Sequence, residues 1–189
     1  MISAVLIEYQ RQKEISEIIS HLKKIPQITE IIVHDNRLYN IFTYGRYKAA
    51  EKASNSIIYT QDDDCLISHI NELISAFDGT QLVNTLRPKH SKEPQYQGAE
   101  TLLGWGSLFK KEWISVFKKY VDKYGEDYLL FRGGDRIFTT LLGQTIKRKT
   151  IIKEIHSFPS ATSNKVALYK RKDYFKTIQK IRERVQTLI

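Results

Sequence analysis

The chain has 189 residues, a mass of 22.1 kDa and a formal net charge of +9. Hydrophobic residues make up 41% of it and charged residues 27%, so a packed core can form and a disordered or low-complexity chain is excluded. The single cysteine, Cys65, excludes a disulfide framework and a zinc site built from several cysteines. We expect one domain over residues 1–189.

The excess positive charge lies in the C-terminal part of the sequence. Residues 147–189 contain twelve Lys or Arg against three Asp or Glu, whereas residues 1–146 contain eighteen of each sign. Such a segment could bind an anionic membrane surface, nucleic acid or a phosphate-bearing substrate, and a solvated helix face is an equally good reading. Residues 1–10 lack a basic leader region, and no apolar run reaches the ~20 residues of a membrane span. We therefore expect a cytoplasmic protein that is either free or peripheral to a membrane.

Strands and helices alternate along the first half of the sequence. Short β-branched runs predict strands at 2–7, 28–33 and 56–60, and apolar residues at helical spacing predict helices at 13–24, 44–53 and 66–77. This alternation predicts an α/β fold in which helices flank a mostly parallel sheet. Sheets of this kind bind ligands beyond the carboxyl ends of their strands.

The second half is less regular. We expect strands at 80–86 and 150–155, a polar loop at 87–98, and helices at 111–120, 136–142 and 174–188. Asp135 would then stand at the N-cap of a helix, directly after two glycines that let the backbone approach a ligand. A catalytic carboxylate and a plain N-cap are both consistent with this position.

Three consecutive carboxylates, Asp62-Asp63-Asp64, follow the third predicted strand directly. Their mutual repulsion is costly unless a cation or hydrogen-bond donors meet them. If the backbone stays extended, Asp62 and Asp64 point to the same side. Oxygen ligands suit Mg²⁺ or Mn²⁺, which usually also bind substrate phosphates. A solvated acidic turn that caps the next helix is the alternative.

The order of motifs resembles nucleotide-sugar glycosyltransferases of the GT-A fold, and more narrowly the exostosin-type glycosyltransferase domain. The strand ending in Asp62-Asp63-Asp64 is similar to the Asp-x-Asp signature of those enzymes. Further matches are Arg87-Pro88-Lys89-His90, the small-residue stretch 103–109 and the acidic helix start at 135–142. The resemblance covers about residues 2–145. The exostosin family usually has a Glu where this chain has Gly134, and its domains are secretory, membrane-anchored and disulfide-containing.

The resemblance implies a role for particular positions. Asp64 would coordinate Mn²⁺ or Mg²⁺ directly, Asp62 and Asp63 would contact the ribose or the metal, and Asp135 would serve as a base or an orienting group for the acceptor hydroxyl. The residues implied to bind the nucleotide sugar are Glu8, Tyr9, Arg11, Arg46, Asp62, Asp63, Arg87 and Trp105. His156 is a candidate third metal ligand beside Asp62 and Asp64, although a lone histidine is more often structural. Trp105, between two glycines, could stack on a sugar or fill the core.

These patterns favour a metal-dependent glycosyltransferase that moves a sugar from a nucleoside-diphosphate sugar, with UDP as the expected nucleotide, to a glycan or another hydroxyl acceptor. A hexosyl or N-acetylhexosaminyl group is the expected cargo. A nucleotidyltransferase is the first alternative, but residues 8–12 lack the glycine-rich phosphate loop of that class. A non-enzymatic module that binds nucleic acid or an anionic surface is the second. No zinc-finger or RNA-binding pattern is visible, and we do not expect nucleic acid as a partner.

Overall fold

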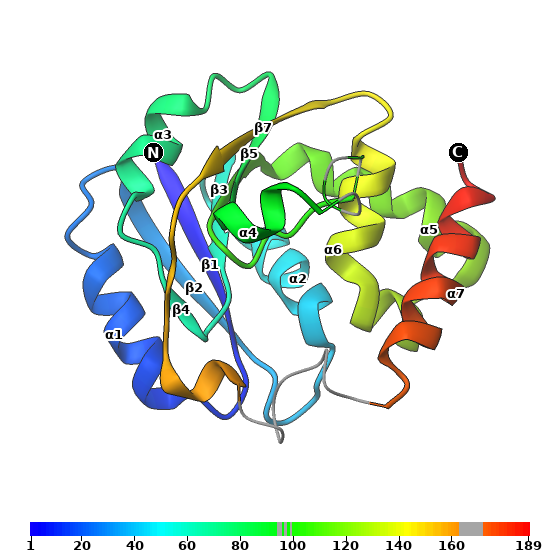
Figure 1. Ribbon diagram of the computed structural model, residues 1–189, viewed down its shortest axis with the longest axis horizontal. Coiled ribbons are helices and arrows are strands. Elements are labelled where there is room, and N and C mark those ends of the chain that lie inside the picture. Colours follow the sequence, from blue (N-terminus) through cyan, green and yellow to red (C-terminus); the bar gives the residue numbers. More distant parts are fainter. Residues whose placement is uncertain (94–95, 97, 99, 163–171) are drawn as a thin grey trace.

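The computed structural model describes residues 1–93, 96, 98, 100–162 and 172–189. Its main sheet has the strand order β2-β1-β3-β6-β5-β7 (Figure 1). The strands are β1 (Ile2–Glu8), β2 (Ile28–Asp35), β3 (Ile57–Gln61), β5 (Gln81–Leu86), β6 (Ser107–Lys110) and β7 (Lys147–Ile152). Only β6 runs antiparallel to its neighbours; β1 pairs in parallel with β2 and β3, and β5 with β7. The predicted α/β fold with a mostly parallel sheet is confirmed.

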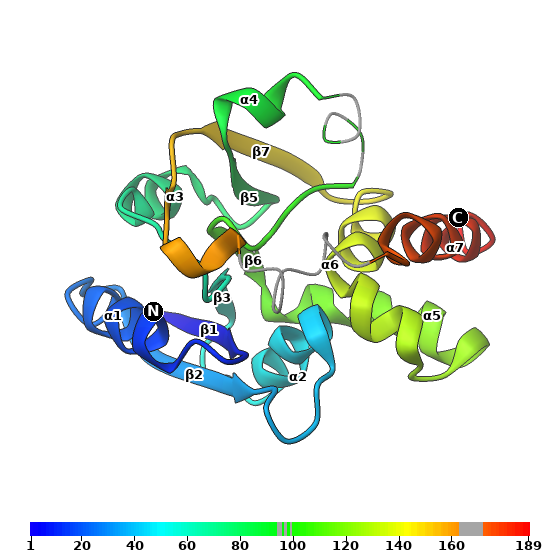
Figure 2. The ribbon, with the colours of Figure 1, turned by 60° about the horizontal axis from the view of Figure 1, so that its bottom comes forward.

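Helices cover both faces of this sheet. They are α1 (Gln12–Leu22), α2 (Gly45–Glu51), α3 (Ile70–Ala76), α4 (Pro88–Ser91), α5 (Phe117–Tyr124), α6 (Tyr128–Leu142) and α7 (Tyr174–Gln186), with 3-10 turns η1 (Phe42–Tyr44), η3 (Lys111–Val116) and η4 (Pro159–Thr162). Figure 2 shows α1 and α3 on one side of the molecule and α5, α6 and α7 gathered on the other, with α2 beside them.

The two faces hold two hydrophobic cores because successive strand residues point to opposite sides. On β1, Val5 faces the core shared with α2, α5, α6 and α7, whereas Ala4 and Leu6 face the core shared with α1 and α3. On β3 the neighbours Ile58 and Tyr59 divide in the same way. The sheet is thus apolar on both faces, which explains why its strands read as continuous apolar runs.

The helix expected at 66–77 begins later, at Ile70. Cys65 and Leu66 instead form a short strand, β4 (Cys65–Leu66), that pairs antiparallel with β8 (His156–Ser157). The side-chain amide of Gln61 also donates to the Cys65 carbonyl at 2.7 Å. The pairing with β8 joins residues distant in sequence, and the second contact depends on the side chain of Gln61. Helical periodicity in the sequence reveals neither of them.

The helix expected at 136–142 begins eight residues earlier. Asp127 is the N-cap of α6, since its carboxylate accepts a hydrogen bond from the Leu130 amide at 2.9 Å. Asp135 therefore lies inside α6, and the prediction that it caps a helix was wrong. Smaller differences of the same kind are the 3-10 turn η3 before α5, the short helix α4 in the expected loop, and the start of β7 at Lys147.

Candidate active site

The three consecutive aspartates follow the end of β3, beside the end of its parallel neighbour β1. They point to different partners. Asp63 faces the end of β1, where its carboxylate accepts a hydrogen bond from the Tyr9 amide at 2.9 Å and pairs with the Arg11 guanidinium at 2.5 Å. Asp63 and Arg11 are both buried. The middle aspartate thus ties β3 to the segment after β1 and is already occupied by protein groups.

Asp62 faces the opposite side and is the more open of the first two aspartates. Its Oδ1 lies 2.5 Å from Nη2 of Arg46, and its side chain is 39% exposed. The backbone amide of Asp62 donates to the Gly104 carbonyl at 2.8 Å, which fixes the turn after β3. One carboxylate oxygen, Oδ2, accepts no hydrogen bond from the described residues.

Asp64 has the least support of the three. Its carboxylate accepts no hydrogen bond from the described residues, although its carbonyl accepts one from the Phe158 amide at 2.9 Å. Burial and the charge of Asp62 raise the pKa of Asp64 to about 7, while Arg11 and Arg87 act in the opposite direction. Two neighbouring carboxylates that keep oxygen atoms without donors favour the binding of a cation.

Asp135 reaches this region from the middle of α6. Its Oδ1 accepts a hydrogen bond from the Tyr47 hydroxyl at 2.9 Å and lies 3.2 Å from Nε of Arg46. Burial raises the pKa of Asp135 to about 6, and Arg46 opposes that shift. The structure therefore brings Asp62 and Asp135 to the same guanidinium, although they are far apart in the sequence.

Arg46 lies beneath the two carboxylates. Its side chain is 0% exposed, and its Nη1 donates to the Thr60 hydroxyl at 3.2 Å. The sequence expectation placed Arg46 against the nucleotide, but its described partners are Asp62, Asp135 and Thr60. Thr60 is a supporting residue that the motif analysis did not assign to the site, and its buried position on β3 was the available signal. Tyr47, the aromatic residue that the resemblance pairs with Arg46 against the nucleotide, is instead fully buried and hydrogen-bonded to Asp135.

The two glycines before Asp135 serve helix packing. A Cβ on Gly134 would lie 3.0 Å from the Tyr44 backbone nitrogen, and one on Gly133 would lie 2.5 Å from Cδ1 of Ile181. They let α6 approach η1 and α7 closely, and so the expectation that they open the backbone to a ligand was wrong. Gly134 replaces an acidic residue of the exostosin pattern at a place with no room for one.

Gly104 lies directly against the carboxylate of Asp62. A Cβ there would lie 1.9 Å from Oδ2 and 2.2 Å from Cγ of Asp62. Any larger residue would displace this carboxylate, so glycine is required by close approach. The sequence showed Gly104 beside Trp105 but gave no sign that it faces Asp62.

Arg87 and Trp105 form a second cluster beside the aspartates. The guanidinium carbon of Arg87 lies 5.0 Å from the centre of the Trp105 ring, and its Nη2 contacts the Ser157 hydroxyl. The ring of His90 lies 4.8 Å from that of Trp105. Trp105 is partly buried against the core on the α1 and α3 side, so both of its predicted roles stay open.

Glu8 and His156, two further predicted site residues, have partners outside the group of Asp62, Arg46 and Asp135. Glu8 ends β1, and its Oε1 lies 3.5 Å from Nη1 of Arg37. His156 lies on β8 opposite Leu66, is exposed, and packs its ring against Phe158 at 5.9 Å. Within the described part of the chain, no contact of His156 joins it to the three aspartates. The structure thus brings Asp62, Asp135 and Arg46 together and leaves His156 on the neighbouring hairpin.

Within the described residues, no group of three or more His, Cys, Asp or Glu side chains converges as a ready metal site. Mg²⁺, however, is commonly held by one or two carboxylates and completed by waters and substrate phosphates. Asp62 and Asp64 fit that smaller requirement, because each has a carboxylate oxygen that accepts no hydrogen bond from the described residues, and the charge of Asp62 raises the pKa of Asp64. Asp63 does not fit it, since Tyr9 and Arg11 already occupy its oxygens.

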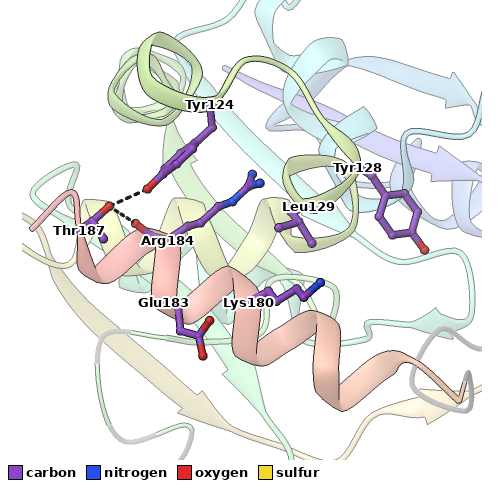
Figure 3. A pocket seen from close by; sticks show the side chains of 7 residues that line it. All are labelled: Tyr124, Tyr128, Leu129, Lys180, Glu183, Arg184 and Thr187. Carbon is purple, nitrogen blue, oxygen red and sulfur yellow. Dashed lines mark hydrogen bonds between the residues drawn. The ribbon is translucent and has the colours of Figure 1, made fainter.

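Two pockets among the described residues lie away from Asp62, Asp63, Asp64 and Asp135. One of about 600 Å³ is formed between α5, α6 and α7 (Figure 3), where Arg184 stacks on Tyr124 at 4.6 Å and pairs with Asp127 at 2.5 Å. The other, of about 380 Å³, lies at the opposite end of β3 from the aspartates and includes Ser56 and Phe77. No predicted site residue lines either pocket.

Several basic residues of the C-terminal segment have acidic partners. Arg182 pairs with Glu100 at 3.0 Å and Arg184 with Asp127. Lys170 and Arg171, two of the expected anion-binding residues, lie outside the described part of the chain. Among the described helices, none has the length and apolar character needed to cross a membrane.

Comparison with known proteins finds no matching family model and no matching curated protein. Similar solved structures exist. TarS 1–349 of S. aureus in complex with UDP has a TM-score of 0.58 and 11% identity, over 99% of this chain and 64% of that chain. A longer TarS structure has a TM-score of 0.56 and 14% identity, over 95% of this chain and 38% of that chain. The present chain therefore spans less than two thirds of either TarS chain.

A second similar protein is glucosyl-3-phosphoglycerate synthase of Mycobacterium tuberculosis. Its structure with Mn²⁺, UDP-glucose and phosphoglyceric acid has a TM-score of 0.51 and 11% identity, over 98% of this chain and 80% of that chain. At such identities the similarity concerns the fold, and it gives no support to the narrower exostosin-type resemblance. The chain has the α/β fold of GT-A glycosyltransferases.

We predict that Gly104→Ala destabilises the protein by forcing the Asp62 carboxylate away from Arg46. The free energy of unfolding should fall by about 1–3 kcal/mol, the usual cost of overpacking a tight site. Urea denaturation monitored by circular dichroism measures it. Gly98→Ala is the matched control, because a Cβ on Gly98 meets nothing within 4 Å, and it should change stability by less than about 0.5 kcal/mol. Equal stability of the two variants would contradict the placement of Asp62.

We predict that Asp135 makes the protein less stable as the pH rises from 5 to 7. Burial holds its pKa near 6 in the folded state against 3.8 for the free side chain, so the folded state binds the extra proton and loses that advantage above pH 6. Relative to Asp135→Asn, the wild-type protein should lose on the order of 1 kcal/mol over this range. Scanning calorimetry at both pH values measures the difference. Parallel pH profiles for wild type and Asp135→Asn would contradict the burial of an ionisable group at this position.

Proposed function

We propose that the chain is a metal-dependent glycosyltransferase that takes a sugar from a nucleoside-diphosphate sugar, UDP being the expected nucleotide. The observation that carries the proposal concerns Asp62 and Asp64, which follow the carboxyl end of the parallel strand β3. Each has a carboxylate oxygen that accepts no hydrogen bond from the described residues. The GT-A fold adds support, and so do the ligands in the similar structures: UDP in TarS, and UDP with Mg²⁺ or UDP-glucose with Mn²⁺ in the synthase.

In this proposal Asp62 and Asp64 hold Mg²⁺ or Mn²⁺ together with the donor diphosphate. The metal would offset the negative charge that develops on the leaving nucleoside diphosphate. Arg87, beside Asp64, would add positive charge at the same place. A positive charge that stabilises the transition state more than the ground state accelerates the reaction. His156 is the proposed third ligand and would have to turn toward the metal, since its described contacts are with Leu66 and Phe158.

Asp135 is the proposed base for the acceptor hydroxyl. Its Oδ1 is held by Tyr47 and lies close to Arg46, which leaves Oδ2 without a hydrogen bond from the described residues. A carboxylate fixed in this way can accept a proton from a bound hydroxyl, and general base catalysis typically contributes ~10²–10⁴-fold. An orienting role for the same carboxylate fits this geometry as well.

The donor would extend from the end of β1 to Trp105. Glu8, Tyr9 and Arg11 are proposed to surround the nucleobase, Asp63 to hold that segment or contact the ribose, and Trp105 to face the sugar. We propose a hexosyl or N-acetylhexosaminyl group as the cargo and a glycan or another hydroxyl compound as the acceptor. Residues 1–189 would form one catalytic domain. Contact of the basic segment 147–189 with an anionic membrane surface is a separate proposal that needs its own test.

The proposal predicts that UDP binding requires a divalent cation and Asp64. Isothermal titration calorimetry should detect UDP binding in Mn²⁺ and none in EDTA. Asp64→Ala should lose the Mn²⁺-dependent binding by at least about a hundredfold while keeping its circular dichroism spectrum. Asp122→Ala is the control, because that carboxylate is an exposed helix residue paired with Lys118.

Three results would count against the proposal. Equal affinity for UDP in the presence of Mn²⁺ and of EDTA would show that UDP binding does not require a metal. Binding of DNA or anionic vesicles in a strongly salt-dependent manner, with no UDP binding under either condition, would favour the non-enzymatic alternative. Release of pyrophosphate from a nucleoside triphosphate and a sugar phosphate would favour a nucleotidyltransferase.

A further inference from the structure

We propose that Arg46 is a positioning residue that serves as the shared counter-ion of the metal-side and acceptor-side carboxylates, and that it competes with the metal for Asp62. The inference rests on the proposed function, which assigns Asp62 to the metal and Asp135 to the acceptor. It changes the role of Arg46 from a nucleotide contact to a buried link between the two halves of the site.

The geometry around the guanidinium carries the inference. Nη2 lies 2.5 Å from Oδ1 of Asp62, and Nε lies 3.2 Å from Oδ1 of Asp135. Nη1 donates to the Thr60 hydroxyl, which itself donates to the Val5 carbonyl at 2.8 Å. All three nitrogens therefore face groups of the protein, and the side chain has no exposed surface with which to meet a nucleotide.

The partners of Arg46 come from separate elements. Asp62 follows β3, Asp135 lies in the middle of α6, and Arg46 itself belongs to α2. The planar guanidinium can contact two carboxylates at once, each along a different edge of its plane. A lysine ammonium is a point charge and does not fix two carboxylates in this way. Arg46 thus sets how far the proposed metal ligand stands from the proposed base.

The contact with Asp135 is not a completed hydrogen bond. Nε of Arg46 is buried and has no partner of acceptable hydrogen-bond geometry, although Oδ1 of Asp135 is 3.2 Å away. The guanidinium is therefore held more firmly by Asp62 than by Asp135. A cation that takes over Asp62 must share this carboxylate with Arg46, and so Arg46 lowers the affinity of the protein for that cation.

The experiment measures Mn²⁺ binding alone, by electron paramagnetic resonance of free Mn²⁺, and UDP binding at saturating Mn²⁺, by calorimetry. Arg46→Met should bind Mn²⁺ about tenfold more tightly than wild type, because one competing positive charge has been removed near Asp62. Arg46→Lys, which keeps the charge, should return the Mn²⁺ affinity to within about twofold of wild type. UDP affinity at saturating Mn²⁺ should stay within about threefold in both variants.

Lys48→Met is the matched control. Lys48 is a cation on the same helix, but it is half-exposed and pairs with Glu51 and Glu126. Removing it changes the net charge equally, so a general charge effect would move its Mn²⁺ affinity as much as that of Arg46→Met. We expect the control to leave Mn²⁺ binding unchanged within about twofold.

The double variant Arg46→Met/Asp135→Asn keeps the test decisive if Arg46→Met fails to fold. It removes both charges of the buried pair, and replacing both partners is far less costly than removing one. Compared with Asp135→Asn, the double variant should again show about tenfold tighter Mn²⁺ binding.

The outcomes separate the two proposals. Unchanged or weaker Mn²⁺ binding in Arg46→Met and in the double variant, with wild type binding normally, would overturn the role of Arg46 alone. Loss of UDP binding in Arg46→Met with unchanged Mn²⁺ binding would make Arg46 a nucleotide contact and also overturn the inference. Absence of Mn²⁺ binding by the wild-type protein would contradict the proposed function itself, and the inference would fall with it.

Discussion

A guanidinium buried between two carboxylates is the interaction on which the site depends. Moving Arg46 out of water is costly, and the cost is offset only if its charge is matched and its donors are engaged. Asp62 and Asp135 supply the opposite charge, and Asp62 and Thr60 accept hydrogen bonds from the two terminal nitrogens of the guanidinium. Because these partners belong to different elements, α2, α6 and the end of β3 must come together for the charge to be buried.

The packing around Arg46 consists largely of close contacts that only small residues permit. Gly134 lets α6 approach the Tyr44 backbone, and Gly104 leaves room for the Asp62 carboxylate. The Tyr47 ring packs between Phe117 and Phe138 while its hydroxyl holds Asp135. Helix α2 thus contributes an aromatic ring to the core and a hydroxyl that donates to the Asp135 carboxylate. Burial of these ionisable groups follows from that arrangement and raises the pKa of Asp135.

The three consecutive aspartates have different surroundings despite their identical chemistry. Alternation along the chain sends Asp63 to the end of β1 and Asp62 to Arg46, while Asp64 is left with little donor support. A pattern of like charges in sequence therefore does not imply a common ligand. Asp63 ties the end of β3 to the segment after β1, and its two neighbours are the ligands that we propose for a cation.

Local pattern was sufficient to predict the first three strands, the helices between them and the position of the aspartates, because apolar periodicity and burial agree there. Asp135 stays a predicted site residue, but the sequence placed it at the start of a helix that in fact begins at Tyr128. The orientation of Arg46 and the need for glycine at 104 could not be predicted. Both depend on contacts between residues distant in sequence, which a single sequence does not encode in any local pattern.

The most direct test of this account is the anomalous scattering of manganese in crystals of the protein with Mn²⁺ and UDP. We expect one strong peak within coordination distance of Asp64 and Asp62, adjacent to the UDP diphosphate, with Asp63 still paired to Arg11. A manganese peak on Asp63, or one remote from all three aspartates, would contradict the division of roles among them.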